Sequence, residues 1–183
     1  MRTPLAPILL AAGLAGAAGC TTLNAFEVTL DGETTIHGDQ ATAGSVLTRI
    51  PAIGSFASID FASSEAFKQN QTTIESVRSL RVVQLEIQIV HPDGQGFDFL
   101  DELHFFAGAG SEEKEVAGKS GIAQLGLVPP NPKLWLEVDP SAELRPLLDA
   151  PSISLTARGS GRVPPQDTTL LATVTLRVEL QLF

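Results

Sequence analysis

Residues 168–183 alternate between apolar and polar side chains, and this alternation restricts the fold more than any other feature of the sequence. Successive side chains of a β-strand point to opposite faces, so an alternating run places all its apolar residues on one face. One buried and one hydrated face are typical of an antiparallel sheet. The predicted apolar face comprises Ala172, Val174, Leu176, Val178, Leu180 and Leu182, and the polar face comprises Thr173, Thr175, Arg177, Glu179 and Gln181.

A second long strand is predicted for residues 74–91. Its apolar face comprises Val83, Leu85, Ile87 and Ile89, opposite Gln84, Glu86 and Gln88. Leu80 and Val82 are at even positions, so in a regular strand they would point to the face opposite Val83, Leu85, Ile87 and Ile89. Because one extra residue reverses the face that a strand presents, we expect a β-bulge near Val82 and Val83.

The rest of the chain is divided into short runs by 12 prolines and 16 glycines. About eight strands separated by turn signals predict an all-β fold, an antiparallel two-sheet sandwich with one or two short helices. A closed β-barrel is the alternative. The expected short elements are a hairpin of 26–30 and 34–36 turning at Asp31-Gly32, strands at 58–61, 103–107, 114–117, 133–138 and 152–158, and helical turns at 64–70, 97–102 and 139–149.

The first twenty residues consist of a basic start at Arg2, an uncharged apolar run, and small residues before Cys20. An apolar run this short is typical of a secretory signal peptide, since a membrane-spanning helix needs about 20 residues. The segment Ala17-Ala18-Gly19-Cys20 resembles the lipobox of bacterial lipoprotein precursors, with Ala17 where leucine is usual. The resemblance implies cleavage before Cys20, diacylglycerol on its sulfur and acylation of the new amino terminus. An ordinary signal peptide with an incidental cysteine is the alternative.

Cys20 is the one cysteine in the sequence. An unpaired thiol is a liability in an oxidising compartment, whereas a thioether is not. Two or three acyl chains anchor a protein stably, since each buried CH₂ contributes ~0.8 kcal/mol. We therefore predict a signal peptide at 1–19, a lipidated N-terminus and short tether at 20–25, and a single sandwich domain at 26–183. In the lipoprotein family, Thr21 rather than aspartate after the cysteine favours the outer over the inner membrane of the bacterial envelope.

The mature chain is strongly acidic. Removal of the leader takes away Arg2 and leaves 11 basic against 21 acidic residues, a net charge of −10. Nucleic acids and anionic lipid surfaces are bound by clustered Lys and Arg. The composition argues against a nucleic-acid partner, and it makes the lipid on Cys20 the expected contact with the membrane.

The mature sequence contains no motif for catalysis, cofactor binding or metal binding. His37, His91 and His104 are far apart along the chain and have no cysteine partner for zinc. The aspartates between 93 and 101 do not have the spacing of a helical calcium loop. We expect no cofactor and no metal. A serine–histidine–acid site assembled from distant residues stays open.

Two stretches are candidate binding elements. The stretch 50–56 is apolar and nearly uncharged, so Ile53 and Phe56, if exposed, would form a docking patch for a partner or an apolar ligand. The alternative, which we favour, is a loop that plugs one end of the sandwich. Arg158 and Arg162 lie in a predicted connection at 158–167, which is either a recognition loop for an anionic partner or a solvated crossover.

Three functions are compatible with these features. The first is a lipid-anchored cell-envelope module, periplasmic or external, that binds or scaffolds an unidentified envelope protein without catalysis. The second is a carrier of a lipid or other apolar ligand between the sheets, which requires an apolar cavity. The third is a cell-envelope hydrolase, which requires a cleft where histidine and carboxylates converge.

Overall fold

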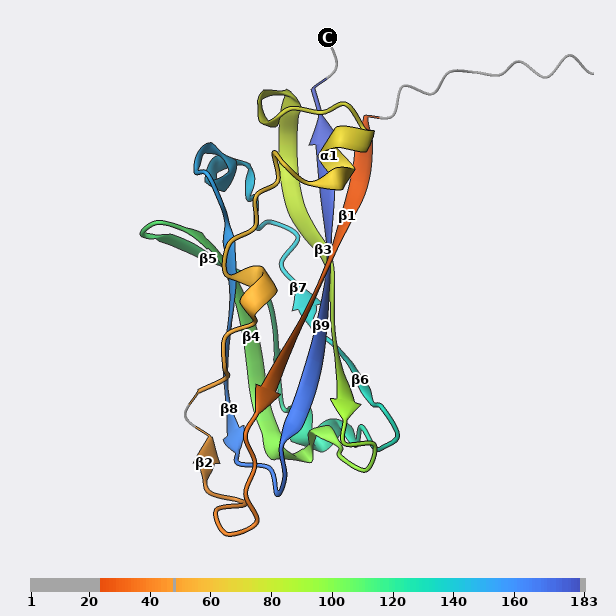
Figure 1. Ribbon diagram of the computed structural model, residues 1–183, viewed down its shortest axis with the longest axis vertical. Coiled ribbons are helices and arrows are strands. Elements are labelled where there is room, and N and C mark those ends of the chain that lie inside the picture. Colours follow the sequence, from red (N-terminus) through yellow and green to blue (C-terminus); the bar gives the residue numbers. More distant parts are fainter. Residues whose placement is uncertain (1–23, 48, 182–183) are drawn as a thin grey trace, which may run out of the picture.

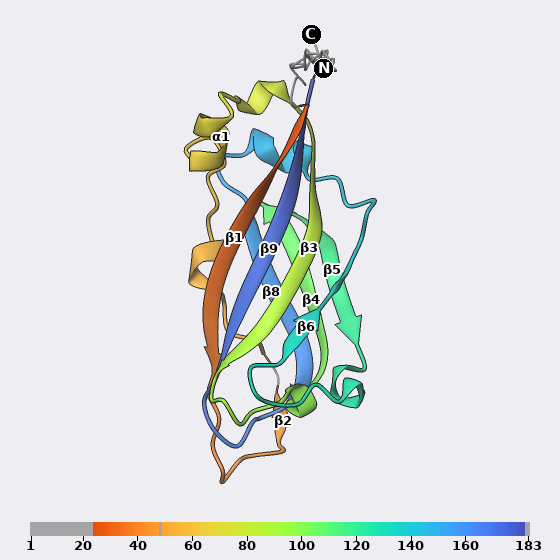
Figure 2. The same ribbon diagram turned by 90° about the vertical axis from the view of Figure 1, so that its right-hand side faces the viewer.

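The computed structural model describes residues 24–47 and 49–181. It consists of two antiparallel sheets of four and five strands packed face to face, as Figure 1 and Figure 2 show. The sheets are separate and do not close into a barrel. The predicted two-sheet sandwich is therefore confirmed. Among the described residues, no helix has the length and apolarity needed to cross a membrane.

The four-stranded sheet is built around the last strand of the chain. Its order is β1 (Ala25–Ile36), β9 (Thr168–Leu180), β3 (Val77–His91) and β6 (Lys133–Trp135). As predicted, β9 is amphipathic: Val174, Leu176 and Val178 are buried, whereas Leu180 is only partly buried. The apolar face of β9 therefore packs against the core, and its polar face lies on the outside of the sheet.

The five-stranded sheet lies opposite and contributes the other half of the core. Its order is β2 (Val46–Leu47), β8 (Ser154–Arg162), β4 (Leu100–Ala109), β5 (Glu112–Ser120) and β7 (Glu137–Val138). Inward side chains such as Leu103, Phe105 and Leu155 are almost fully buried. Both outermost strands have only two residues.

The helices are single turns between strands. Helix α1 (Glu65–Gln69) lies within the expected turn at 64–70 and is capped by Ser64, whose Oγ accepts a hydrogen bond from the Phe67 N–H. The 3-10 turns are η1 (Gly54–Phe56), η2 (Ile74–Ser76), η3 (Phe97–Phe99), η4 (Ile122–Leu125) and η5 (Arg145–Asp149). The helix expected from residue 139 begins only at Arg145.

The predicted bulge in β3 is present. The register against β9 shifts between Val82 and Gln84, so Leu80 and Val82 are buried on the same face as Leu85. Val83 was predicted to face the core, and that is wrong. As the extra residue of the bulge, it points outward and is 42% exposed.

The predicted hairpin at Asp31-Gly32 is wrong. β1 continues through both residues, with Asp31 opposite Thr173 and Gly32 opposite Ala172. The turn signal is overridden because β9 offers a ladder partner along the whole length of β1. Gly32 serves close packing instead: a Cβ there would overlap Ser55 Oγ and Ile53 Cγ2.

Residues 49–61 close one long side of the sandwich, and we term them the β1–β8 cover. Ser55 Oγ donates to the Asp31 carbonyl oxygen of β1 at 3.0 Å. Near β8, Ile59 exchanges two backbone hydrogen bonds with Ile153. This single bridge replaces the short strand expected at 58–61.

Residues 136–149 close the opposite long side, and we term them the β3–β5 cover. The strand expected at 133–138 divides into β6 and β7 because the chain passes from one sheet to the other at Leu136. The Asp139 N–H then donates to the Val116 carbonyl of β5, and the Leu144 N–H returns to the Leu80 carbonyl of β3.

Candidate functional site

Four loops form a groove of about 870 Å³ at one end of the sandwich, which we term the end groove. Figure 1 places these loops at the end opposite Ala25, where β1 begins. The lining residues come from the segments 43–44, 94–99, 123–129 and 162–165. The groove is therefore assembled from parts of the chain that are up to 122 positions apart, from Ala43 to Pro165.

Close contact between two loops forms one wall of the end groove. A Cβ on Gly96 would crowd the Leu127 carbonyl oxygen, and the Phe97 N–H points to that same oxygen. Gly126 has a φ of +63°, which favours glycine. These two glycines allow the 94–99 and 123–129 loops to pack backbone to backbone.

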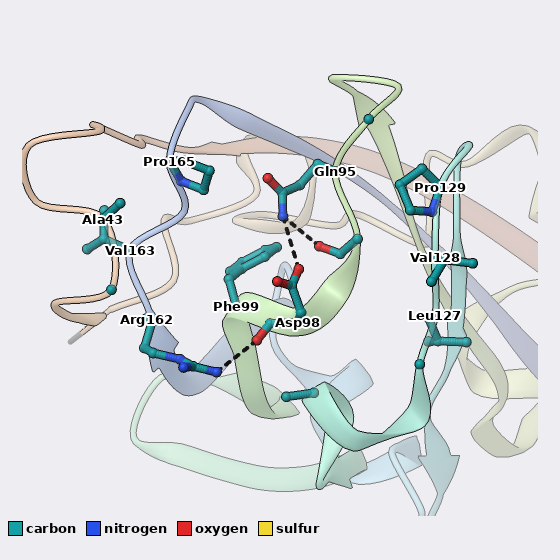
Figure 3. Close-up of a pocket in the computed structure, with 15 residues that line it drawn as sticks. Ala43, Gln95, Asp98, Phe99, Leu127, Val128, Pro129, Arg162, Val163 and Pro165 are labelled. Carbon is teal, nitrogen blue, oxygen red and sulfur yellow. Dashed lines mark hydrogen bonds between the residues drawn. The ribbon is translucent and has the colours of Figure 1, made fainter.

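The polar groups of the end groove converge on the turn at Asp98 (Figure 3). The buried Gln95 donates from Nε2 to the Gly96 carbonyl at 2.9 Å and to Asp98 Oδ1 at 3.3 Å. Arg162 Nη2 reaches from β8 to the Asp98 carbonyl oxygen at 3.1 Å. One side of the groove thus offers an exposed carboxylate beside an exposed guanidinium.

The opposite side of the end groove is apolar and exposed. Val128 is 72% exposed, and Leu127 and Pro129 beside it also line the groove. Phe99, which lines the groove, is buried. Apolar surface beside a few placed polar groups is typical of a binding site.

Among the described residues, those that line the end groove include no serine, threonine, cysteine, lysine or histidine. No group of three metal-ligating side chains that could hold an ion occurs within 24–47 and 49–181. Asp98 contacts Gln95 rather than other carboxylates. The arrangement suits binding by contact and hydrogen bonding.

The predicted connection at 158–167 is much shorter in the structure, because Arg158 and Arg162 both belong to β8. Arg162 lines the end groove, as described. Arg158 lies four residues away, pairs with Glu113 at 2.5 Å and stacks over the Phe106 ring at 4.4 Å. The two arginines therefore do not share a recognition loop.

Ile53 and Phe56 lie in the β1–β8 cover with exposures of 6% and 1%. Buried side chains do not form an exposed docking patch, so the plug is the better interpretation. The segment closes a long side of the sandwich rather than an end. Beside it lies a second groove of about 470 Å³, lined by the 49–57 segment and by residues 155–159 of β8, which we term the β8 groove. Ile53 and Arg158 both line it.

Among residues 24–47 and 49–181, no serine hydroxyl is hydrogen-bonded to a histidine ring. His104 Nδ1 lies 2.7 Å from Glu115 Oε1, and His104 Nε2 lies 3.9 Å from Glu102 Oε2. Ser160 is close by, but its hydroxyl donates to Glu102 at 3.0 Å and not to the imidazole. In a serine–histidine site the imidazole accepts the hydrogen bond from the serine hydroxyl. Here the Glu102 carboxylate accepts it instead.

Glu143 is a structural group that the sequence did not reveal. In the β3–β5 cover its carboxylate accepts from Ser79 Oγ at 2.6 Å, the Leu80 N–H at 2.8 Å and the Arg145 N–H at 2.9 Å. Partial burial disfavours the charged form, but these hydrogen bonds outweigh it and hold the pKa of Glu143 below its ordinary value of 4.5. The ionised carboxylate therefore fastens the cover to β3.

No protein-family model matches the sequence, and no curated protein is significantly similar to it. Among solved structures, the decameric BFDV capsid protein aligns at 12% identity and a TM-score of 0.42, over 86% of this chain and 98% of that chain. The structure of Cocksfoot mottle virus aligns at 13% identity and a TM-score of 0.22, over 100% of this chain and 97% of that chain. TM-scores this low say nothing about function.

Cys20 and the leader lie outside the described residues. The lipid anchor therefore stays a prediction from the sequence.

Proposed function

We propose that the protein is a lipid-anchored β-sandwich of the bacterial cell envelope that binds a partner in its end groove without catalysing a reaction. The observation that carries the proposal is that the start of β1 and the end groove lie at opposite ends of the domain. Ala25 begins β1 at one end, only five residues after Cys20, and the end groove lies at the other end.

The length of β1 sets the distance between anchor and groove. A strand of 12 residues spans about 40 Å at roughly 3.3 Å per residue. A lipid on Cys20 would hold the start of β1 near the membrane surface. The end groove would then face away from the bilayer, where a second envelope component can reach it.

The two other functions have less support. A carrier would need an apolar cavity between the sheets, but the inward side chains of β3, β4 and β9 pack against one another with exposures of 0–2% at positions such as Leu80, Phe105 and Val174. A hydrolase would need a serine–histidine contact. The cluster around His104 has a serine–glutamate contact in its place.

The anchor is tested with Cys20→Ser in the full-length precursor. We expect the wild type to partition with membranes and to label with a fatty-acid probe, and the variant to lose both properties. Membrane partitioning and normal maturation of the variant would contradict the proposal.

The groove is tested with Val128→Cys, a 72% exposed position on its rim. A thiol-reactive cross-linker should capture a discrete partner from intact envelopes at this position. Thr29→Cys, exposed on β1, is the matched control. Equal capture from both positions, or from neither, would contradict binding in the end groove.

A further inference from the structure

The outer edge of β8 is an open hydrogen-bonding edge. Ile153 exchanges backbone hydrogen bonds with Ile59, and the Val163 N–H donates to the Ser45 carbonyl, both on the side away from β4. Backbone groups of a strand alternate in direction with a period of two residues. The N–H and C=O groups of Leu155, Ala157 and Gly159 therefore point to that same side.

No partner fills this part of the edge within the described residues. β2 pairs only with residues 161 and 162 of β8. None of the backbone hydrogen bonds among residues 24–47 and 49–181 reaches Leu155, Ala157 or Gly159 from the β1–β8 cover. The β8 groove, about 470 Å³ in volume, runs along these residues and gives solvent access to them.

The edges formed by β1, β6 and β7 are protected in ways that this one is not. Outer strands β6 and β7 have three and two residues, too few to template another strand. The free edge of β1 carries Glu27, Asp31 and Glu33, and charged side chains discourage pairing. The open residues of β8 are uncharged.

We propose that the β8 groove binds an extended polypeptide segment of another protein, with acidic and apolar residues in alternation, as an added strand beside β8. Strand addition uses the backbone for affinity and alternate side-chain positions for specificity. This surface is independent of the end groove.

The lining of the groove defines the occupant. Side chains on the inner face of the added strand would meet Ile50 and Ile53, which line the groove wall. Those on the outer face would lie beside Arg158, the outward residue between Ala157 and Gly159. Arg49, exposed at the groove, forms no ion pair within 24–47 and 49–181. Arg158 is already paired with Glu113, so it is Arg49, an exposed cation in a protein with a net charge of −9, that favours a carboxylate on the partner.

Amide hydrogen exchange tests the open edge in the free mature protein. We expect fast exchange at Leu155, Ala157 and Gly159, and slow exchange at Thr156 and Arg158, whose N–H groups face β4. Slow exchange at all five amides would overturn the proposal. Protection of the three open amides that rises with protein concentration would also overturn it, since a second copy would then be the occupant.

Peptide binding tests the occupant. The probe is a fluorescein-labelled, acetylated heptapeptide of four glutamates alternating with three valines, measured by anisotropy. We expect saturable binding that protects Leu155, Ala157 and Gly159 from exchange. A peptide with lysine in place of glutamate should bind at least tenfold more weakly, and one N-methylated at alternate residues should not bind. Equal binding of all three peptides, or of none, would overturn the proposal.

Two variants complete the test. Ala157→Pro removes an N–H that faces the groove and breaks no bond to β4, so we expect a loss of binding of at least tenfold. If this variant does not fold, Arg49→Glu decides the matter, with an expected loss of at least fivefold. Arg177→Glu, on the outer face of the other sheet, is the control and should bind normally. Unchanged peptide binding by the Arg49→Glu variant would overturn the proposal that the partner segment is acidic.

Discussion

The two long sides of the sandwich are closed by different kinds of contact. The β1–β8 cover is held mainly by apolar burial, with Ile53 and Phe56 packed over Gly32. The β3–β5 cover also buries apolar side chains such as Leu144 and Leu147, and it adds backbone hydrogen bonds to the strands on both sides and the Glu143 carboxylate.

This difference decides what each side leaves available. A cover made of backbone hydrogen bonds consumes the edge groups of the strands that it joins. A cover made of side chains fills space but leaves the strand backbone unpaired. Leu155, Ala157 and Gly159 therefore remain open to a new strand on the β1–β8 side.

The largest effect is expected from removing the apolar contacts of the β1–β8 cover. Ile53→Ser combined with Phe56→Ser should lower the free energy of unfolding by about 3–6 kcal/mol, because burying one such side chain contributes roughly 1.5–3 kcal/mol. Urea denaturation of the mature protein measures it. A loss below about 1 kcal/mol would show that this segment does not close the sandwich.

A second variant examines the close approach beneath the cover. Gly32→Ala places a methyl group against Ser55 and Ile53, and overpacking of this kind costs about 1–3 kcal/mol. Because the two positions are in contact, Ile53→Ala should lower the free energy of unfolding by less in the Gly32→Ala background than in the wild type. Gly54→Ala is the control: a Cβ there meets no atom within 4 Å, so we expect a change within about 0.5 kcal/mol. Strictly additive effects of the two contact positions would contradict the packing.

The β3–β5 cover is tested with Glu143→Gln, which keeps the shape and removes the charge. Hydrogen bonds to charged groups contribute about 1.5–3 kcal/mol, and the amide retains one acceptor, so we expect a loss of about 1–2 kcal/mol at pH 7. Amide exchange should quicken at Leu80 and not at Ile59. Equal acceleration at both would mean that the two covers are not independently held.

The smallest expected effect is the pH dependence of the stability that Glu143 gives to the β3–β5 cover. The pKa of Glu143 is lower in the folded protein than its ordinary value of 4.5, so its stabilisation is present above that value and is lost as the pH falls through the folded pKa. The stability difference between the wild type and Glu143→Gln should therefore shrink below about pH 4.5. Denaturation curves from pH 7 to pH 3 measure it, and a difference that stays constant would contradict the role of the ionised carboxylate.

The local pattern was enough to predict the two long strands β3 and β9 and the sheet class. Alternation in 168–183 requires one buried and one hydrated face whatever the partner strand is. The bulge in β3 followed in the same way, from two apolar sets of opposite parity. The helical turn expected at 64–70 likewise has a local cause, the hydrogen bond from the Phe67 N–H to Ser64 Oγ. These features are predictable because their causes lie within a few residues of sequence.

The features that depend on contacts between distant segments were decided by the tertiary structure. Asp31-Gly32 carries a turn signal, yet it runs straight because β9, some 140 residues later, supplies the ladder partner. Arg158 and Arg162 were expected in a loop and belong to β8, because β4 pairs with Arg158 and β2 pairs with Arg162. Gln95, Arg162 and Val128 come together in the end groove only through loop packing.

The sequence by itself determined the alternation of the long strands and the acidic charge, since each is a property of the residues themselves, and it predicts lipid attachment at Cys20. Only the tertiary structure decided that Ile53 and Phe56 are buried, that Glu143 fastens a cover, and that the β8 edge stays open. Burial and free backbone groups depend on which distant segments meet, and a one-dimensional pattern does not contain that information.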